Sequence, residues 1–215
     1  MLPFYHIFLH AIKVLFSMER VRRGFMMKKK LLGALVGAVI AFAWGYVSWQ
    51  VLPWHEWSMK SFEQGGAAVT DAIKKEALTS GLYSLPNFDK DARTDKAKHE
   101  AWMKQAHEGP AAFVAVRLEG MRFDLIGTLV GQFITQFLVA FLGVWLLTKT
   151  IIVPVVQKAV FISVVVASGV FLFNMGGWIW CGIPSVSVLI AVVDALVAWF
   201  LAGLGMGVIM KPRNA

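Results

Sequence analysis

Asp194 is the only carboxylate within the four strongly hydrophobic runs of the chain, at 31–52, 125–148, 154–176 and 185–210. A carboxylate near the middle of a bilayer costs about 2.5–3.5 kcal/mol on insertion scales, so we expect it to face other helices and to have a polar partner. Counting residues inward from the ends of the runs places three uncharged polar side chains at a similar depth. We therefore predict an intramembrane polar layer of Asp194, Gln132, Gln136 and Ser168.

This polar layer has three interpretations. The leading one is an interhelical hydrogen-bond clamp, in which each bond contributes about 0.6–2 kcal/mol. The first alternative is a path for an ion, a proton or a substrate, since ionisable residues inside a membrane often serve that role. The second alternative is a carboxylate that faces lipid and reaches toward the interface.

The histidines do not have the spacing of a metal site. His55 lies beside Glu56 and between two tryptophans, and His99 and His107 are eight residues apart, which is not a normal ligand pair. No GxSxG or SxxK sequence offers a serine nucleophile, and no glycine-rich phosphate loop follows a strand. We predict no catalytic residue, no metal and no cofactor, and we interpret His55 as part of the membrane interface.

The composition excludes an ordinary soluble domain. Of the 215 residues, 58% are hydrophobic and 16% are charged, whereas soluble domains approach a quarter charged. Each of the four runs is about the 20 residues that a bilayer core requires, and spanning segments surrounded by lipid must be helical. The predicted fold is an all-α membrane protein, a bundle of four transmembrane helices with a small α+β insert at 53–124.

The distribution of charge predicts the orientation. Residues 53–124 contain ten basic and eleven acidic side chains, whereas the termini and the connection between spans two and three contain eleven basic residues against Glu19 alone. By the positive-inside rule both termini, residues 1–30 and 211–215, are cytoplasmic and the insert is extracytoplasmic. The formal charge of +8 is then a topology signal, and we predict no nucleic-acid partner.

Aromatic and small residues mark the ends and the faces of the spans. Amphipathic indoles favour the headgroup layer, which predicts interface anchors at Trp49, Trp54, Trp57, Trp178 and Trp180, the last two in a loop between spans three and four. Small residues spaced by four let helix backbones approach closely. The predicted packing residues are Gly33, Gly37, Ala41, Gly45, Gly127, Gly131, Gly203 and Gly207.

Residues 1–30 and the insert are the segments outside the spans. The leader is either an interfacial helix or an upstream extension, because Met26 and Met27 directly precede a lysine cluster and the first run. In the insert, apolar periodicity predicts helices at 67–78 and 95–107 and strands at 82–85 and 112–118.

Several short motifs resemble one family. They are Leu52-Pro53-Trp54-His55, Ser61-Phe62, Gly81-Leu82-Tyr83-Ser84-Leu85-Pro86, and Gly109-Pro110 leading through Phe113 to Glu119-Gly120-Met121. Together they are similar to a family of uncharacterised bacterial inner-membrane proteins. The resemblance covers residues 31–210 and implies four spans with an extracytoplasmic insert, but it brings no activity.

These patterns favour a non-enzymatic inner-membrane protein that is an accessory or assembly subunit, with the lipid bilayer and another membrane or envelope protein as partners. One alternative is a small transporter or channel that uses the layer around Asp194. The other is a membrane-embedded enzyme that acts on a lipid or quinone.

Overall fold

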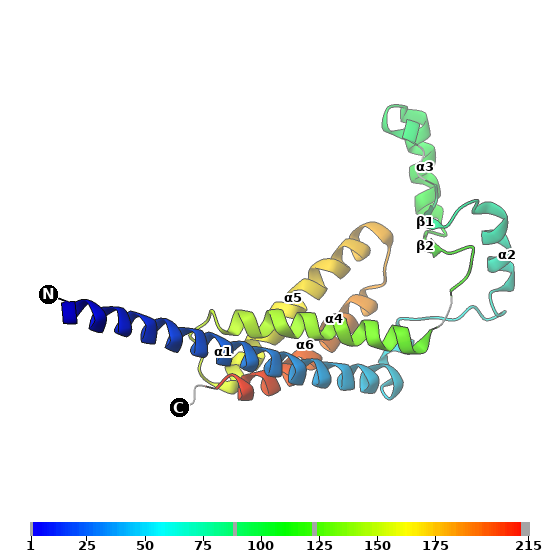
Figure 1. Cartoon of the computed structure of the whole chain (residues 1–215). Helices are drawn as coiled ribbons and strands as arrows, with labels where there is room; N and C mark the ends of the chain where they lie inside the picture. Colours follow the sequence, from blue (N-terminus) through cyan, green and yellow to red (C-terminus); the bar gives the residue numbers. More distant parts are fainter. Residues whose placement is uncertain (1, 88–89, 122–123, 212–215) are drawn as a thin grey trace. The chain divides into compact units, whose positions relative to one another are not determined.

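The computed structural model describes the backbone of residues 2–87, 90–121 and 124–211, and within these ranges the side chains from Gly24 onward (Figure 1). The described chain forms six α-helices and one two-stranded sheet. Four helices are long and apolar enough to cross a membrane. They are α1 (Leu2–Gln50), α4 (Leu125–Leu147), α5 (Val155–Cys181) and α6 (Ser185–Ile209). The predicted fold class is confirmed.

Two of these helices differ from the expected boundaries. α1 is one uninterrupted helix of 49 residues, so no break separates the leader from the span at Gly24–Gln50. α5 continues to Cys181, and the expected loop around Trp178 and Trp180 is its last helical turn. The helix ends at Gly182, whose φ of +69° favours glycine, and the Ile183 N–H then donates to the carbonyl of Gly177 at 3.2 Å.

The chain divides into two compact units. The first comprises Met1–Ser48, Ile126–Ala167 and Ala195–Ala215, and the second comprises Trp49–Leu125 and Ser168–Asp194. The core of the first unit is formed largely by small side chains on all four long helices. It includes Ala34, Ala38, Ala140, Val144, Ala159, Ile162, Ala202 and Met206, each at most 1% exposed.

Five of the predicted packing residues lie at close helix contacts in the first unit. A Cβ added to Gly203 would come within 2.6 Å of the Cα of Ala159, and one added to Gly37 within 2.8 Å of the Cγ of Met206. Gly33 and Gly207 are similarly crowded by neighbouring helices, and Ala41 is only 1% exposed. The short distances at these positions let the helix backbones approach closely.

The other three predicted packing glycines lie in open positions. No atom lies within 4 Å of a Cβ added at Gly45 or Gly131 in the described part of the chain, and Gly127 is exposed. Two contacts that the sequence analysis missed are Gly143 against Ile162 and Gly205 against Val36 and Ile40. Spacing by four residues identifies a smooth stripe, but it does not say which stripe another helix covers.

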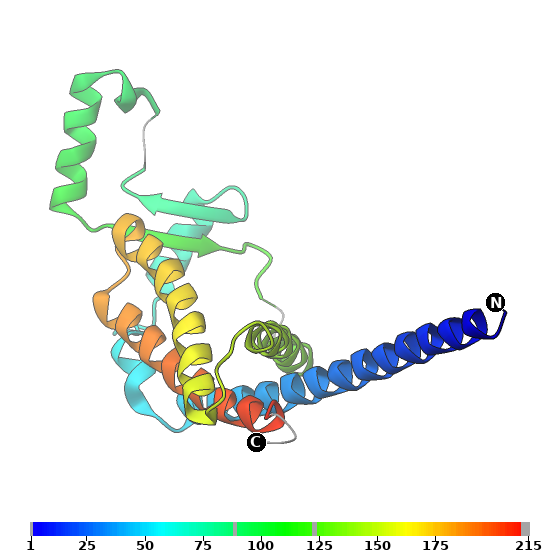
Figure 2. The same cartoon turned by 90° about the vertical axis from the view of Figure 1, so that its left-hand side faces the viewer.

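The insert belongs to the second unit and has the predicted small α+β character. It contains η1 (Pro53–Trp57), α2 (Ala67–Glu76), β1 (Gly81–Leu85), η2 (Lys90–Arg93), α3 (Lys96–Glu108) and β2 (Ala112–Val116). β1 and β2 pair antiparallel, as the two opposed arrows in Figure 2 show. Gly81 lies opposite Val116, and Leu85 lies opposite Ala112.

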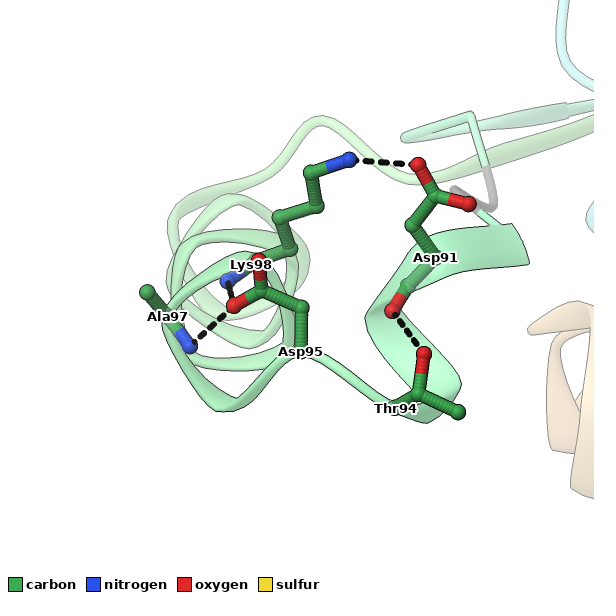
Figure 3. Close-up of polar contacts among 5 residues, drawn as sticks. All are labelled: Asp91, Thr94, Asp95, Ala97 and Lys98. Atoms are coloured by element: carbon green, nitrogen blue, oxygen red, sulfur yellow. Dashed lines mark hydrogen bonds and ion pairs between the residues drawn. The ribbon is translucent and has the colours of Figure 1, made fainter.

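Asp95 determines where α3 begins. Its carboxylate accepts hydrogen bonds from the backbone N–H groups of Ala97 (2.9 Å) and Lys98 (3.2 Å), two donors that have no partner inside the helix (Figure 3). The Lys98 ammonium in turn lies 2.5 Å from the Asp91 carboxylate on η2. A hollow of about 480 Å³ opens beside this turn, but a carboxylate already bonds the helix N-terminus there.

Ser80 joins the end of the sheet at which β1 begins and β2 ends. Its hydroxyl accepts from the Leu118 N–H at 3.0 Å and donates to the Glu119 carboxylate at 2.6 Å. This donated bond, helped by the positive charge of Arg117, lowers the pKa of Glu119 below its usual value.

Replacing Ser80 by alanine is expected to raise the pKa of Glu119 toward the ordinary glutamate value. A carboxyl whose pKa is depressed by folding contributes stability above its unfolded pKa and loses it as the pH falls through the folded pKa. As the pH falls below about 4.5, the insert of the Ser80→Ala protein should therefore lose less stability than the unsubstituted insert does. NMR titration of the Glu119 side chain measures the shift directly, and an unchanged midpoint would contradict the assignment.

Candidate functional site

Asp194 and His55 form an ionisable pair in the second unit. The Nε2 atom of His55 lies 3.9 Å from the Oδ2 atom of Asp194, and the two side chains are 13% and 20% exposed. This separation is an ion-pair distance when the imidazole is protonated, and it is too long for a direct hydrogen bond. Asp194 is carried by α6, whereas His55 comes from the short helical turn η1 after the first span.

Local backbone chemistry fixes the position of His55. Pro53 begins η1, and its ring restricts the backbone of Leu52 to the extended conformation in which α1 cannot continue. At the other end, the carbonyl of His55 accepts from the N–H groups of Ser58 (3.2 Å) and Met59 (3.1 Å) and from the Ser58 hydroxyl (3.0 Å). The turn is closed on the histidine itself, which holds its side chain in one place.

Two tryptophans hold the imidazole ring. The Trp49 indole stacks on it with centroids 3.8 Å apart and an interplanar angle of 10°, and the Trp54 indole meets it edge to face at 5.9 Å and 83°. The imidazole therefore has an indole face on one side and an indole edge contact on another, and the Asp194 carboxylate lies beside it. The cluster joins η1 to α6.

The other members of the predicted polar layer belong to α4 and α5. Gln132 is exposed and Gln136 is half-buried on α4, in the first unit, and Ser168 is exposed on α5 in the second. The sequence analysis missed the pairing of Asp194 with His55, which it treated only as an interface residue. The signal that could have indicated it is chemical: His55 is the sole histidine next to a predicted span end in the insert, and Asp194 is the sole carboxylate within a span.

The predicted interface anchors differ in their exposure. Trp49, Trp57 and Trp178 are exposed and Trp54 is half-buried, while Trp180 is 85% exposed. Trp178 also connects the two helices of the α5–α6 hairpin, because its indole N–H donates to the Ser185 hydroxyl at 2.9 Å. Beside this bond lies an apolar groove of about 290 Å³, lined by Phe171, Met175, Trp178, Ser185, Val188, Leu189 and Val192.

One face of the two-stranded sheet is open. In the observed register Leu82 and Ser84 on β1 lie on the same face as Ala115 and Phe113 on β2, and all four are exposed. We call these four residues the open sheet face. Leu82 is 69% exposed and Phe113 is 47% exposed, whereas Val116 on the opposite face is buried.

Among the residues described, no three His, Cys, Asp or Glu side chains gather closely enough to hold a metal ion. Comparisons of the chain with known protein families, with curated proteins and with solved structures find no match. The functional argument therefore depends on the two sites described above, the His55–Asp194 pair and the open sheet face.

Proposed function

We propose that this protein is an accessory or assembly subunit of a bacterial inner membrane, with both termini cytoplasmic and an insert that binds another envelope protein. The observation that carries the proposal is the open sheet face. Exposed large apolar side chains outside the spans mark interaction surfaces in otherwise polar segments. The resemblance of the sequence to bacterial inner-membrane proteins and the positive-inside distribution support the location and orientation.

The insert has little core of its own, which supports a partner. No residue of α2, α3 or η1 is buried, and the buried apolar residues among the described positions of the insert are Ala77, Ala92 and Val116. A lone two-stranded sheet is marginally stable in water and gains stability when a further layer covers it. Covering the open sheet face with another protein would supply that layer.

α4 offers a second contact suited to a membrane partner. Its buried residues are Ala140, Gly143, Val144 and Leu147, all in its C-terminal half, so its N-terminal half is exposed. Gly127 and Gly131 lie four residues apart on that exposed half, and small residues at this spacing admit the backbone of another helix.

Polar substitution of the open sheet face tests the proposal. We expect Leu82→Ser combined with Phe113→Ser to abolish co-purification of the partner, because the buried apolar contact area is lost, while changing stability by less than about 1 kcal/mol, since both side chains are exposed. An amine-reactive cross-linker that cannot cross the membrane, applied to spheroplasts, should trap the partner on the unsubstituted protein only.

The matched control for that experiment is Val69→Ser, which changes an exposed apolar residue of the same insert that belongs to α2 and not to the sheet. It should retain the partner. Recovery of the unsubstituted protein as a lone species from native membrane, or equal retention of the partner by all three proteins, would refute the proposal.

A second candidate function, a small proton or cation transporter, is favoured by one observation. His55, on the segment that follows the first span, lies beside the sole carboxylate of α6, and histidine side chains commonly serve as proton carriers. Such a pair fits the first step of a path into the bundle. Substitution of Asp194 separates this candidate from the accessory subunit, as argued in the Discussion.

A further inference from the structure

Two lysines from different helices bind the C-terminal end of α6. The Lys29 ammonium on α1 donates to the carbonyl of Lys211 at 3.1 Å, and the Lys158 ammonium on α5 donates to the carbonyl of Met210 at 3.2 Å. The last carbonyls of a helix lack intrahelical donors and carry partial negative charge, so cations are favourable there. All of these residues belong to the first unit.

Packing brings the lysines to this position. Gly207 on α6 lies against Val155 and the Cβ of Lys158, and Gly33 on α1 lies against Ile209 and Met210. Because these glycines have no side chain, there is room for the aliphatic part of Lys158, a residue that is only 4% exposed. The charges of Lys29 and Lys211 both act on the Lys158 ammonium, so three positive groups meet at this end of the bundle.

The described side chains of the first unit include no acid to balance these charges. The described parts of the first unit from residue 24 onward contain six lysines and no aspartate or glutamate. The two carbonyl bonds use one donor on each of two ammonium groups, and each ammonium has three. Donors and positive charge are therefore left over, and a buried or half-buried cation without a counterion is unfavourable.

We propose that Lys29, Lys158 and Lys211 bind the phosphate of an anionic phospholipid headgroup. The site lies where α6 ends and α5 begins, at the end of their apolar segments, which is the level of lipid phosphates in a bilayer. Basic clusters between transmembrane helices recognise anionic headgroups through charge and ammonium hydrogen bonds. A lipid is the source favoured over free phosphate, because its acyl chains would lie along the exposed apolar helix surfaces beside the site.

Lipid titration of the purified full chain, followed by native mass spectrometry, tests the proposal. We expect phosphatidylglycerol to bind more tightly than phosphatidylcholine with the same acyl chains. Each lysine near an anionic surface contributes about fivefold in affinity. The double substitution Lys29→Gln and Lys211→Gln should then weaken phosphatidylglycerol binding by about 25-fold. Glutamine keeps an N–H donor for the carbonyl, and Lys158 is left in place because its loss would also uncap α6.

Lys149→Gln is the matched control. Lys149 follows the end of α4, where its ammonium lies over the Trp145 ring at 5.7 Å, outside the three-lysine cluster. Its substitution should leave phosphatidylglycerol binding unchanged. Equal binding of both lipids, an equal loss in the Lys149→Gln protein, or full displacement of the lipid by millimolar inorganic phosphate would each overturn the assignment to a lipid headgroup.

Discussion

Replacing Gly203 by alanine is expected to destabilise the helix bundle by about 1–3 kcal/mol, because the new methyl group would overlap backbone atoms of α5. The added Cβ would lie 2.6 Å from the Cα and 3.1 Å from the carbonyl oxygen of Ala159. Neither atom can move without shifting the whole helix. Thermal unfolding of the purified protein in a mild detergent measures the loss.

Gly131→Ala is the matched control for this substitution. Nothing in the described chain lies within 4 Å of its added methyl group, and alanine favours a helix over glycine by about 1 kcal/mol. The control should therefore be as stable as the unsubstituted protein or slightly more so. If the Gly203→Ala and Gly131→Ala proteins unfold at the same temperature, α5 and α6 do not make this close contact.

Two further variants identify the cause of the loss. Ala159→Gly should not rescue Gly203→Ala, because the nearest atoms are backbone and remain in place. Gly37→Ala should cost less than Gly203→Ala, since its nearest neighbour is the flexible side chain of Met206. The order of the four stabilities is thus a direct test of the helix packing.

Removing His55 is expected to destabilise the second unit by about 1–3 kcal/mol, because the partly buried Asp194 carboxylate then loses the imidazole that lies beside it. His55→Ala should be rescued in large part by Asp194→Asn, which removes the charge that needs compensation. The coupling energy of this double-mutant cycle isolates the pair from the loss of the Trp49 stack, since the single variant His55→Ala and the double variant lose that stack equally. A coupling energy near zero would mean that the two side chains do not interact.

Asp194→Asn alone separates the two candidate functions. Asparagine keeps the size and most of the hydrogen-bonding capacity of aspartate, but it cannot exchange a proton near neutral pH. For an accessory subunit the variant should keep its partner and its stability within about 1 kcal/mol. Loss of proton or cation flux in proteoliposomes, at unchanged stability and partner retention, would instead favour the transporter.

The sequence predicts the spans well because a bilayer imposes one requirement on length and polarity at once. The strands could also be predicted from the sequence. Pro86 and the Gly109-Pro110 pair delimit two short apolar segments, and the structure places β1 and β2 in them. The last turn of α5 could not be predicted in this way. The Gly176-Gly177 pair suggests a helix break, but the helix continues to Cys181.

The partner of Asp194 could not be derived by counting residues. That method compares depths along straight spans, so it finds polar groups on other spans and ignores the turns between them. His55 reaches Asp194 only because Pro53 ends α1 and η1 then redirects the chain. The contact depends on a change of chain direction at one proline, and no apolar periodicity in α1 or α6 predicts it.

The lysine bonds at the end of α6 join segments of the chain that are synthesised at different times. The donor on α1 precedes its acceptor by 182 residues and the donor on α5 by 52. During translation the first span is therefore complete long before the carbonyl that its lysine binds has been made. A chain released before α6 is complete would leave both lysines without these carbonyl acceptors.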